Sequence, residues 1–224
     1  MTSDIWESKY LDAYGKVLLN CDIYLAVRDF HIDAMRQCEI VLDSGSGTGN
    51  VTRELLIQGK FVHAVDKSKK ALQILEDKCK DYKERLKIYK INAEKLPFAD
   101  ETFNGITSMF VLNFVDDFEA YLREHYRVLR ENSIFAISAR QSAEKTELFL
   151  QSYEYSLRKR GLLPQLEREM EIIRKGNLGE VRTAIKHLHS PATIEEILRG
   201  IGFREIKEFP NPYFGERYSL VARK

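Results

Sequence analysis

The chain has 224 residues, enough for one α/β domain with a sizeable core and a small insertion. Its 35 Lys and Arg residues against 34 Asp and Glu residues give a formal charge of +1, so no global field favours nucleic acid or an anionic membrane surface. Residues 1–20 mix charged and apolar side chains, and no later run has the length and apolarity of a membrane span, so we expect a cytoplasmic protein without a signal peptide.

The first part of the chain predicts helices, then a strand, a glycine-rich turn and another helix. Apolar and aromatic residues recur every three to four positions over residues 4–35, which is typical of helices. Residues 40–50 read I-V-L-D-S-G-S-G-T-G-N: an apolar strand that ends at Asp43, then three alternating glycines. We expect Thr48 or Asn50 to cap the helix that follows.

Strand and helix patterns then alternate. Apolar runs bounded by turn residues predict further strands at 61–65, 86–91, 106–112, 133–138, 203–209 and 218–222. Ser68 is placed to cap the helix after the second strand, and residues 116–130 form an amphipathic helix whose N-terminal charges are Asp116 and Asp117. The alternation predicts an α/β fold, Rossmann-like and doubly wound, with a mostly parallel seven-stranded sheet and helices on both faces.

The alternation stops over residues 141–190, which are charged, helical in pattern and interrupted by Gly161, Pro164, Gly176 and Gly179. We interpret this segment as a helical cap inserted into a single domain of residues 1–224. In that division the N-terminal helices are 1–37 and the core is 38–140 with 191–224. Thr193 to Glu196 has the spacing of a capping box for the helix after the cap.

Four predicted strands end in polar residues: Asp43, Asp66, Asn92 and Asn113. In an open parallel sheet, ligands bind beyond the carboxyl ends of the strands, near the point where the strand order reverses. The four residues therefore predict one shared cleft.

Two ligand classes compete for the glycine turn. A dinucleotide site has the pattern G-x-G-x-x-G with an acidic residue about twenty positions later, and Asp66 fits that spacing. However, Gly45, Gly47 and Gly49 give G-x-G-x-G, and a carboxylate at Asp43 would repel a pyrophosphate. The charge favours a cationic nucleoside.

Several segments together resemble class I S-adenosylmethionine-dependent methyltransferases, most closely the branch of quinone biosynthesis and related small molecules. They are V-L-D-S-G-S-G-T-G at 41–49, A-V-D at 64–66, N-A-E-K-L-P-F at 92–98 with D-E-T-F at 100–103, Y-R-V-L at 126–129, and 194–203. The resemblance implies S-adenosylmethionine as cofactor and S-adenosylhomocysteine as product. It implies Asp43 and the Gly45–Gly47 backbone at the methionine portion, Asp66 on the ribose hydroxyls and Asn92 with Ala93 at the adenine. The implied cofactor-binding set is Asp43, Ser44, Gly45, Ser46, Gly47, Asp66, Lys67, Asn92, Ala93, Phe110 and Val111.

The chemistry implied is in-line displacement, which needs an aligned acceptor and no nucleophile or metal from the protein. No metal-ligand motif occurs in the sequence, and the three cysteines, Cys21, Cys38 and Cys79, are expected to be reduced core thiols. His31, His187 and His189 are the candidates for a general base, and Asn113 for a substrate contact or a strand cap. His63 and His125 are expected to be structural.

Acceptor selection is expected in the cap and the N-terminal helices. Phe149, Tyr153, Tyr155, Leu157 and Leu162 line a pocket there or form the cap's own core. A small-molecule acceptor is favoured, and nucleic acid is not expected. Two alternatives stay open: a macromolecular acceptor with phosphate contacts at 158–160 and 174–175, and a non-catalytic cofactor-binding protein. The sequence leaves the oligomeric state open.

Overall fold

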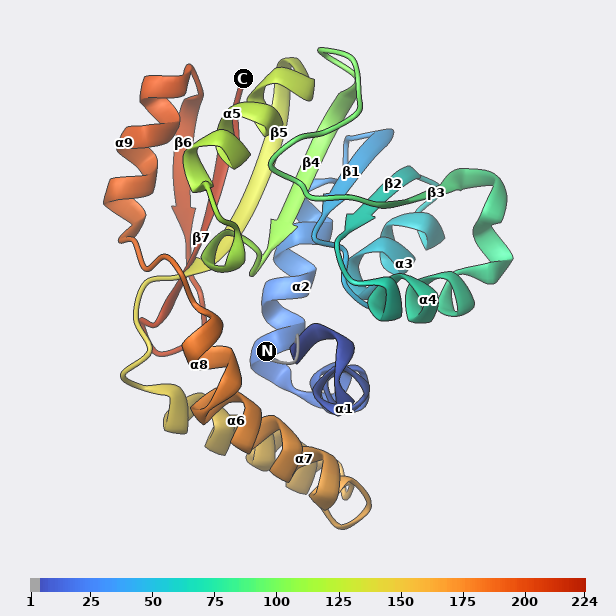
Figure 1. Cartoon of the computed structure of the whole chain (residues 1–224), viewed down its shortest axis with the longest axis vertical. Helices are drawn as coiled ribbons and strands as arrows, with labels where there is room; N and C mark the ends of the chain where they lie inside the picture. The colour runs from blue at the N-terminus through green and yellow to red at the C-terminus, as the bar shows by residue number, and fades with distance from the viewer. Residues whose placement is uncertain (1–4) are drawn as a thin grey trace.

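A computed structural model describes residues 5–224; the first residues of the predicted N-terminal segment, 1–4, lie outside them. Its centre is a seven-stranded sheet in the order β3-β2-β1-β4-β5-β7-β6 (Figure 1). The first five strands are parallel, and β7 runs antiparallel to β5 and β6, as the predicted mostly parallel sheet requires. The strands are β1 Ile40–Ser44, β2 Phe61–Asp66, β3 Leu86–Lys90, β4 Phe103–Met109, β5 Leu129–Arg140, β6 Arg204–Phe209 and β7 Arg217–Arg223.

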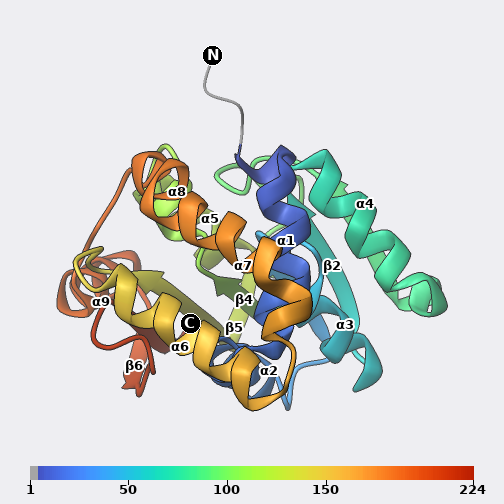
Figure 2. The ribbon, with the colours of Figure 1, turned by 90° about the horizontal axis from the view of Figure 1, so that it is seen from below.

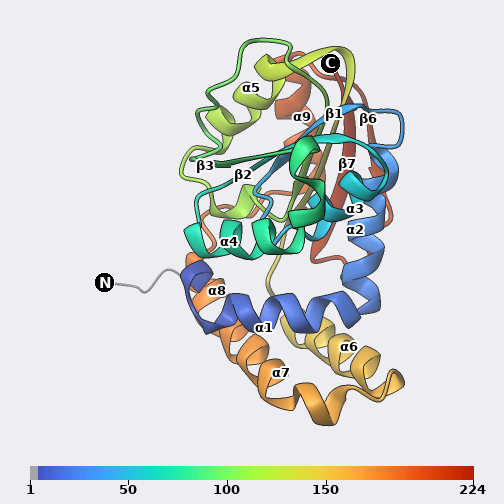
Figure 3. The ribbon, with the colours of Figure 1, turned by 90° about the vertical axis from the view of Figure 1, so that its right-hand side faces the viewer.

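Helices cover both faces of the sheet (Figures 1 and 3). On one face α2, α3 and α4 bury side chains such as Ile32, Leu55 and Leu75 against β1 and β2. On the other face α5 and α9 pack against β4, β5 and β7 through residues such as Leu122 and Leu198. Their bounds are α2 Asp22–Ala34, α3 Asn50–Ile57, α4 Lys69–Lys78, α5 Phe118–Val128 and α9 Pro191–Ile201.

A third layer lies beyond the carboxyl ends of the parallel strands. It contains α1 Lys9–Val17 together with α6 Thr146–Lys159, α7 Leu163–Leu178 and α8 Glu180–Ala184. Figure 3 shows α1 between the sheet and α6 and α7, and Figure 2 shows α1 and α7 side by side. Segment 141–190 is thus helical as predicted, but it shares one apolar cluster with the N-terminal helices.

Two predicted helix interruptions in the cap need correction. Gly176 does not interrupt a helix but lies inside α7, where a Cβ would come within 2.3 Å of Cδ2 of Tyr10. The glycine therefore permits the close approach of α7 to α1. Pro164 also interrupts nothing, because it occupies the first turn of α7, where a missing N–H is tolerated.

The predicted fourth and fifth strands have wrong bounds. β4 ends at Met109 and not at residue 112, because Phe110 takes the left-handed conformation with φ of 63°. Its N–H donates to the Ser138 carbonyl at 2.8 Å, which fixes the turn. Left-handed backbone at a bulky residue is strained, and such residues concentrate at functional sites. β5 is twice the predicted length and continues to Arg140.

Helix starts confirm the predicted Ser68 cap and the predicted N-terminal charge at Asp117, and they correct two other cap predictions. The Ser68 side chain accepts from the Ala71 N–H and caps α4, and Asp117 accepts from Ala120 in α5. In contrast, α3 has Gly49 at its N-cap and no side-chain cap, so neither Thr48 nor Asn50 acts as predicted. The helix that follows the helical cap segment begins at Pro191, two residues before the expected capping box, and its N-cap is Ser190.

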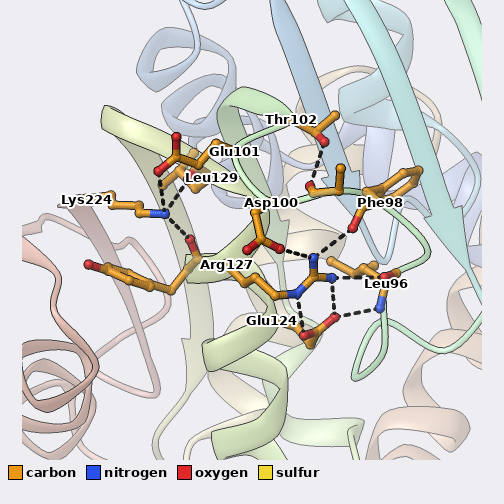
Figure 4. A network of polar contacts seen from close by, with 11 residues as sticks. Leu96, Phe98, Asp100, Glu101, Thr102, Glu124, Arg127, Leu129 and Lys224 are labelled. Atoms are coloured by element: carbon orange, nitrogen blue, oxygen red, sulfur yellow. Dashed lines mark hydrogen bonds and ion pairs between the residues drawn. The ribbon is translucent and has the colours of Figure 1, made fainter.

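A polar network at the opposite end of the sheet from the third layer joins two of the motif segments (Figure 4). Arg127 of α5 donates to the carbonyls of Leu96 and Phe98, to Asp100 and, through two nitrogens, to Glu124, at 2.7–3.0 Å. The arginine of Y-R-V-L therefore fixes the loop that carries L-P-F-A-D. These two motifs occur together for a structural reason.

Candidate active site

One cavity of about 190 Å³ lies between the carboxyl ends of the strands and the third layer. Three of the four predicted strand-end residues, Asp66, Asn92 and Asn113, line it. The cavity begins at the strand-order reversal between β1 and β4 and extends under α1, α7 and α8. The predicted shared cleft is thus present, with a roof made by the N-terminal helices and the cap.

The glycine loop after β1 directs its N–H groups inward. Gly45 and Ser46 donate to the Val65 carbonyl at 2.8 and 3.0 Å, and Gly47 donates to Asp66 at 2.9 Å. A phosphate-binding loop instead needs its N–H groups free for the anion. This loop is therefore poorly suited to a pyrophosphate.

The left-handed glycines shape the cavity in two different ways. A Cβ at Gly45 would come within 2.2 Å of Val111, so the absence of a side chain lets Val111 cover the loop. A Cβ at Gly47 would meet no atom within 4 Å, and Gly47 lines the cavity. A larger residue at position 47 would project into the space where a ligand passes over the loop.

Asp66 presents a carboxylate held in a fixed orientation. Its Oδ2 accepts the Gly47 N–H at 2.9 Å and its Oδ1 accepts the Ser68 N–H at 2.8 Å. Each oxygen keeps a free lone pair, which suits the two hydroxyls of a ribose. Burial raises the pKa of Asp66, while these N–H donors lower it.

Three residues of the implied cofactor set do not line the cavity. Asp43 is buried behind the loop and accepts a hydrogen bond from Thr52 at 2.5 Å. Burial raises the pKa of Asp43 to about 7. The Ser44 hydroxyl lies 3.1 Å from that of Tyr121, and the buried Ser46 hydroxyl has no hydrogen-bond partner among residues 5–224. These side chains lie behind the loop and not against the cavity.

The remaining residues of the implied set do line the cavity: Lys67, Asn92, Ala93, Phe110 and Val111. The Asn92 side chain accepts the Glu94 N–H at 3.1 Å, so its amide nitrogen is the group that stays available. Phe110 reaches the cavity because its left-handed turn ends β4 there.

None of the histidines among residues 5–224 lines the cavity, so the structure does not bring the three candidate bases to it. His31 is buried in α2, bridges Thr107 and Ser138, and has a pKa lowered by burial to about 3. His187 and His189 pack against Phe118 outside the cavity.

Two further histidines are structural, as predicted. His125 is fully buried and its Nε2 lies 2.8 Å from the Ser44 hydroxyl. His63 stacks on Tyr89, and burial lowers its pKa to about 4.

Asn113 lines the cavity but acts as a structural link. Its amide nitrogen donates to the carbonyls of Arg140 and His187 at 2.8 and 2.7 Å, and its oxygen accepts the Arg140 N–H at 2.8 Å. Both N–H donors are therefore used. Asn113 fixes the end of β5 and does not offer its amide to a substrate.

The structure adds lining residues that the sequence did not single out. From the N-terminal segment, where acceptor selection was expected without a named residue, come Trp6, Tyr10 and Tyr14. Arg140 at the end of β5 and Arg217 at the start of β7 also line the cavity. No local pattern marks these arginines, because they meet only when β5 pairs with β7.

Most of the predicted acceptor-pocket residues form the cap's own core. Phe149, Tyr153 and Leu157 are buried in one cluster with α1, and of these only Tyr153 reaches the cavity. Tyr155 is exposed. The three cysteines are buried and unpaired, and no group of metal-ligating side chains occurs among residues 5–224. No described helix has the length and apolarity needed to cross a membrane.

Comparison with known proteins agrees with this geometry. A family model described as "Methyltransferase domain" matches residues 42–137. The chain is 27% identical over 206 residues to the ubiquinone/menaquinone biosynthesis C-methyltransferase UbiE of Geotalea uraniireducens, covering 86% of the chain and 83% of that relative. It is 35% identical over 92 residues to a demethylmenaquinone methyltransferase of Tropheryma whipplei, but this match covers 41% of the chain and 38% of the relative.

The fold is also found among solved structures. The 1,6-didemethyltoxoflavin-N1-methyltransferase of Burkholderia thailandensis, solved with 1,6-didemethyltoxoflavin and S-adenosylhomocysteine, is 18% identical with a TM-score of 0.65, over 98% of this chain and 87% of that chain. The motifs, the sheet order and these matches agree with one another, and together they support a class I S-adenosylmethionine-dependent methyltransferase.

Proposed function

We propose that this methyltransferase acts on a small-molecule acceptor enclosed between the carboxyl end of the sheet and the cap. The main support is that one cavity extends from Gly47 and Asp66 to the aromatic side chains of α1. One continuous space with a polar and an aromatic end suits a cofactor and an acceptor side by side.

The cofactor is proposed to lie over β1, β2 and β4. Asp66 would accept hydrogen bonds from the ribose hydroxyls, Asn92 and Ala93 would contact the adenine edge, and the Gly45–Gly47 backbone would adjoin the methionine portion. The fixed carboxylate of Asp66 and the free space above Gly47 support this assignment. Asp43 is proposed to act on the cationic cofactor by its charge from behind the loop, since it does not line the cavity.

S-adenosylmethionine supplies an electrophilic methyl group on a sulfonium, which a nucleophilic atom of the acceptor displaces in line as the thioether leaves. The protein's part is to orient the acceptor and to exclude water. Burial raises the pKa of Tyr10 to about 12 and that of Tyr14 well above its usual value, so neither hydroxyl ionises as a base near neutral pH. The acceptor is therefore expected to bring its own nucleophile.

The small-molecule assignment rests on the relatives and on the surface of the cap. The relatives named above are methyltransferases of quinone biosynthesis, which act on small molecules. Of the cations considered for phosphate binding, Arg160 pairs with Asp22, and Arg174 pairs with Glu147 and Glu154. Such pairing leaves fewer free cations for a nucleic acid. The expected cytoplasmic location stays a prediction.

Calorimetric titration with S-adenosylhomocysteine tests the cofactor assignment. We expect Asp66→Ala to weaken binding at least tenfold, because two charge-assisted hydrogen bonds are lost, and Asp43→Ala to weaken it less. Asp77→Ala, at an exposed position of α4, is the matched control and should bind like the wild type. Tighter binding of a nicotinamide dinucleotide than of S-adenosylhomocysteine would refute the assignment.

Transfer of a labelled methyl group from S-adenosylmethionine into fractions of a cell extract tests the acceptor class. Label is expected in the small-molecule fraction. Label confined to nucleic acid or protein would contradict the proposed acceptor, and cofactor binding without any label would favour a non-catalytic role.

A further inference from the structure

The cavity contains two arginines that face each other across neighbouring strands. Arg140 on β5 and Arg217 on β7 are direct partners in the antiparallel register, so their side chains leave the sheet on the same side. Like charges directly opposite in a sheet are destabilising. Two arginines placed opposite each other at a cavity need a nearby anion to offset their repulsion.

Neither guanidinium finds that group within residues 5–224. No ion pair or hydrogen bond joins either side chain to another described residue, and the hydrogen bonds of Arg140 to Asn113 use its backbone alone. Arg140 is only 5% exposed and keeps Nη1 buried without a partner, and Arg217 keeps Nε in the same condition. Burial and the neighbouring Arg217 lower the pKa of Arg140 to about 10. Buried arginine donors without acceptors lower the stability of the folded protein, and the fold keeps them despite this free-energy penalty.

Aromatic rings hold Arg217 in place without using its donors. Its guanidinium carbon lies 3.8 Å from the centre of the Tyr213 ring and 4.2 Å from that of Phe110, and Phe149 lies on the same group at 5.0 Å. Stacking on ring faces uses the π system of the cation and leaves its in-plane N–H groups free. Such a planar fork matches the two oxygens of a carboxylate.

Arg140 is held through its backbone. Asn113 accepts the Arg140 N–H and donates to its carbonyl, both at 2.8 Å, so Asn113 is a positioning residue for this arginine. These bonds fix the backbone of Arg140, and its guanidinium carbon lies 5.4 Å from the centre of the Phe149 ring. Aromatic contacts thus orient both guanidinium groups in advance of any ligand.

The local charge indicates a singly charged anion. Glu216 is the one buried carboxylate close enough to raise the pKa of Arg140, although it forms no ion pair with it within residues 5–224. Its Oε1 accepts the Lys145 N–H. Two arginines and one glutamate leave a single positive charge in excess, which fits a carboxylate better than a phosphate dianion.

The position of Arg140 and Arg217 in the sheet places them on the acceptor side of the cavity and not on the cofactor side. Asp66 lies at the end of β2, on one side of the reversal between β1 and β4, whereas β5 and β7 lie on the other side. The rings of Trp6, Tyr10 and Phe114 lie around the same cavity, with edge-to-face contacts at 5.5–5.7 Å. An acceptor with a flat apolar body suits these rings.

We infer that Arg140 and Arg217 bind the carboxylate of the methyl acceptor, and that the acceptor is an aromatic carboxylic acid. This inference rests on the proposed small-molecule function. The two arginines orient the acceptor and are not required for cofactor binding.

Ligand-observed NMR titrations of the protein loaded with S-adenosylhomocysteine test the inference with benzoate, benzamide and phenyl phosphate as probes. We expect benzoate to bind at least tenfold more tightly than benzamide, its uncharged analogue. Arg140→Met and Arg217→Met should each weaken benzoate at least tenfold and change the calorimetric affinity for S-adenosylhomocysteine less than twofold. Arg158→Met, which removes an exposed arginine of α6, is the control and should bind benzoate normally.

Several results would overturn the inference. Equal binding of benzoate and benzamide would exclude charge recognition, and tighter binding of phenyl phosphate would exclude a carboxylate. Loss of S-adenosylhomocysteine affinity in Arg217→Met would assign the pair to the methionine carboxylate instead. If the wild type fails to bind S-adenosylhomocysteine, the proposed function fails, and titration of the unloaded protein still tests the arginines. Should a Met variant unfold, Arg217→Lys retains the charge but not the fork and is expected to weaken benzoate several-fold.

Discussion

The arginine side chains at the two ends of the parallel sheet differ in their hydrogen bonding. At one end, Arg127 makes five hydrogen bonds to two carbonyls and two carboxylates (Figure 4). At the other end, Arg140 and Arg217 make none through their side chains to any residue from 5 to 224. A satisfied guanidinium stabilises a loop, whereas an unsatisfied one at a cavity is available to a ligand.

Asp43 is a second incompletely paired charge at the carboxyl end of the sheet, where the cavity lies. This carboxylate is 2% exposed, accepts a side-chain hydrogen bond from Thr52, and has a pKa raised by burial to about 7. The cavity end therefore keeps charges of both signs that the fold does not compensate. Functional sites commonly reduce stability in this way.

The largest effect is expected from Arg127→Met. The substitution removes five hydrogen bonds and leaves the carbonyls of Leu96 and Phe98 without their donor, which should lower the free energy of unfolding by about 3 kcal/mol. The exposed pair with Asp100 contributes little to this figure, because its carboxylate side chain is 74% exposed. Urea unfolding measures the change. A loss below about 1 kcal/mol would contradict the structural role.

Asp43→Asn should give a pH-dependent gain of about 2 kcal/mol. An aspartate has a pKa near 3.9 when unfolded, and burial raises it to about 7 in the folded protein. The folded state therefore binds the proton more tightly, and the stabilisation present below about pH 4 is lost as the pH rises through 7. Asn lacks this titration, so the variant should gain stability relative to the wild type from pH 5 to pH 8.

Thermal or urea unfolding of both proteins across this range checks the prediction. A stability difference that does not change with pH would show that Asp43 keeps an ordinary pKa. Asp77→Asn, at the exposed position of α4, is the control and should show no such trend.

The smallest effect is expected from Arg217→Met, and its sign is opposite to that at Arg127. Arg217 is half-buried and has no ionic partner among residues 5–224. Replacing this cation by an apolar side chain of similar length should leave the free energy of unfolding unchanged or raise it by about 1 kcal/mol. Loss of the contacts with Tyr213 and Phe110 limits the gain. Destabilisation by more than 2 kcal/mol would show that Arg217 holds the fold and would remove the contrast with Arg127.

Local patterns predicted much of the fold. Apolar runs, polar strand ends and glycines placed all seven strands, and they brought Asp66 and Asn92 to the cleft, because each depends on a few consecutive residues. Predictions from local patterns were wrong where a residue distant in the sequence sets the end or the continuity of an element. Phe110 ends β4 early through a bond to Ser138, and Gly176 stays inside α7 because Tyr10 packs against it.

The sequence by itself determined the order of strands and helices, the glycine turn after β1 and the cofactor class that its motifs imply. Only the tertiary structure decided which side chains meet across the cavity. It left the candidate histidines outside, committed Asn113 to the end of β5 and brought Arg140 opposite Arg217. The reason is physical: periodicity and turn preference act over a few residues, whereas the pairing of two arginines far apart in the chain depends on the register of β5 with β7.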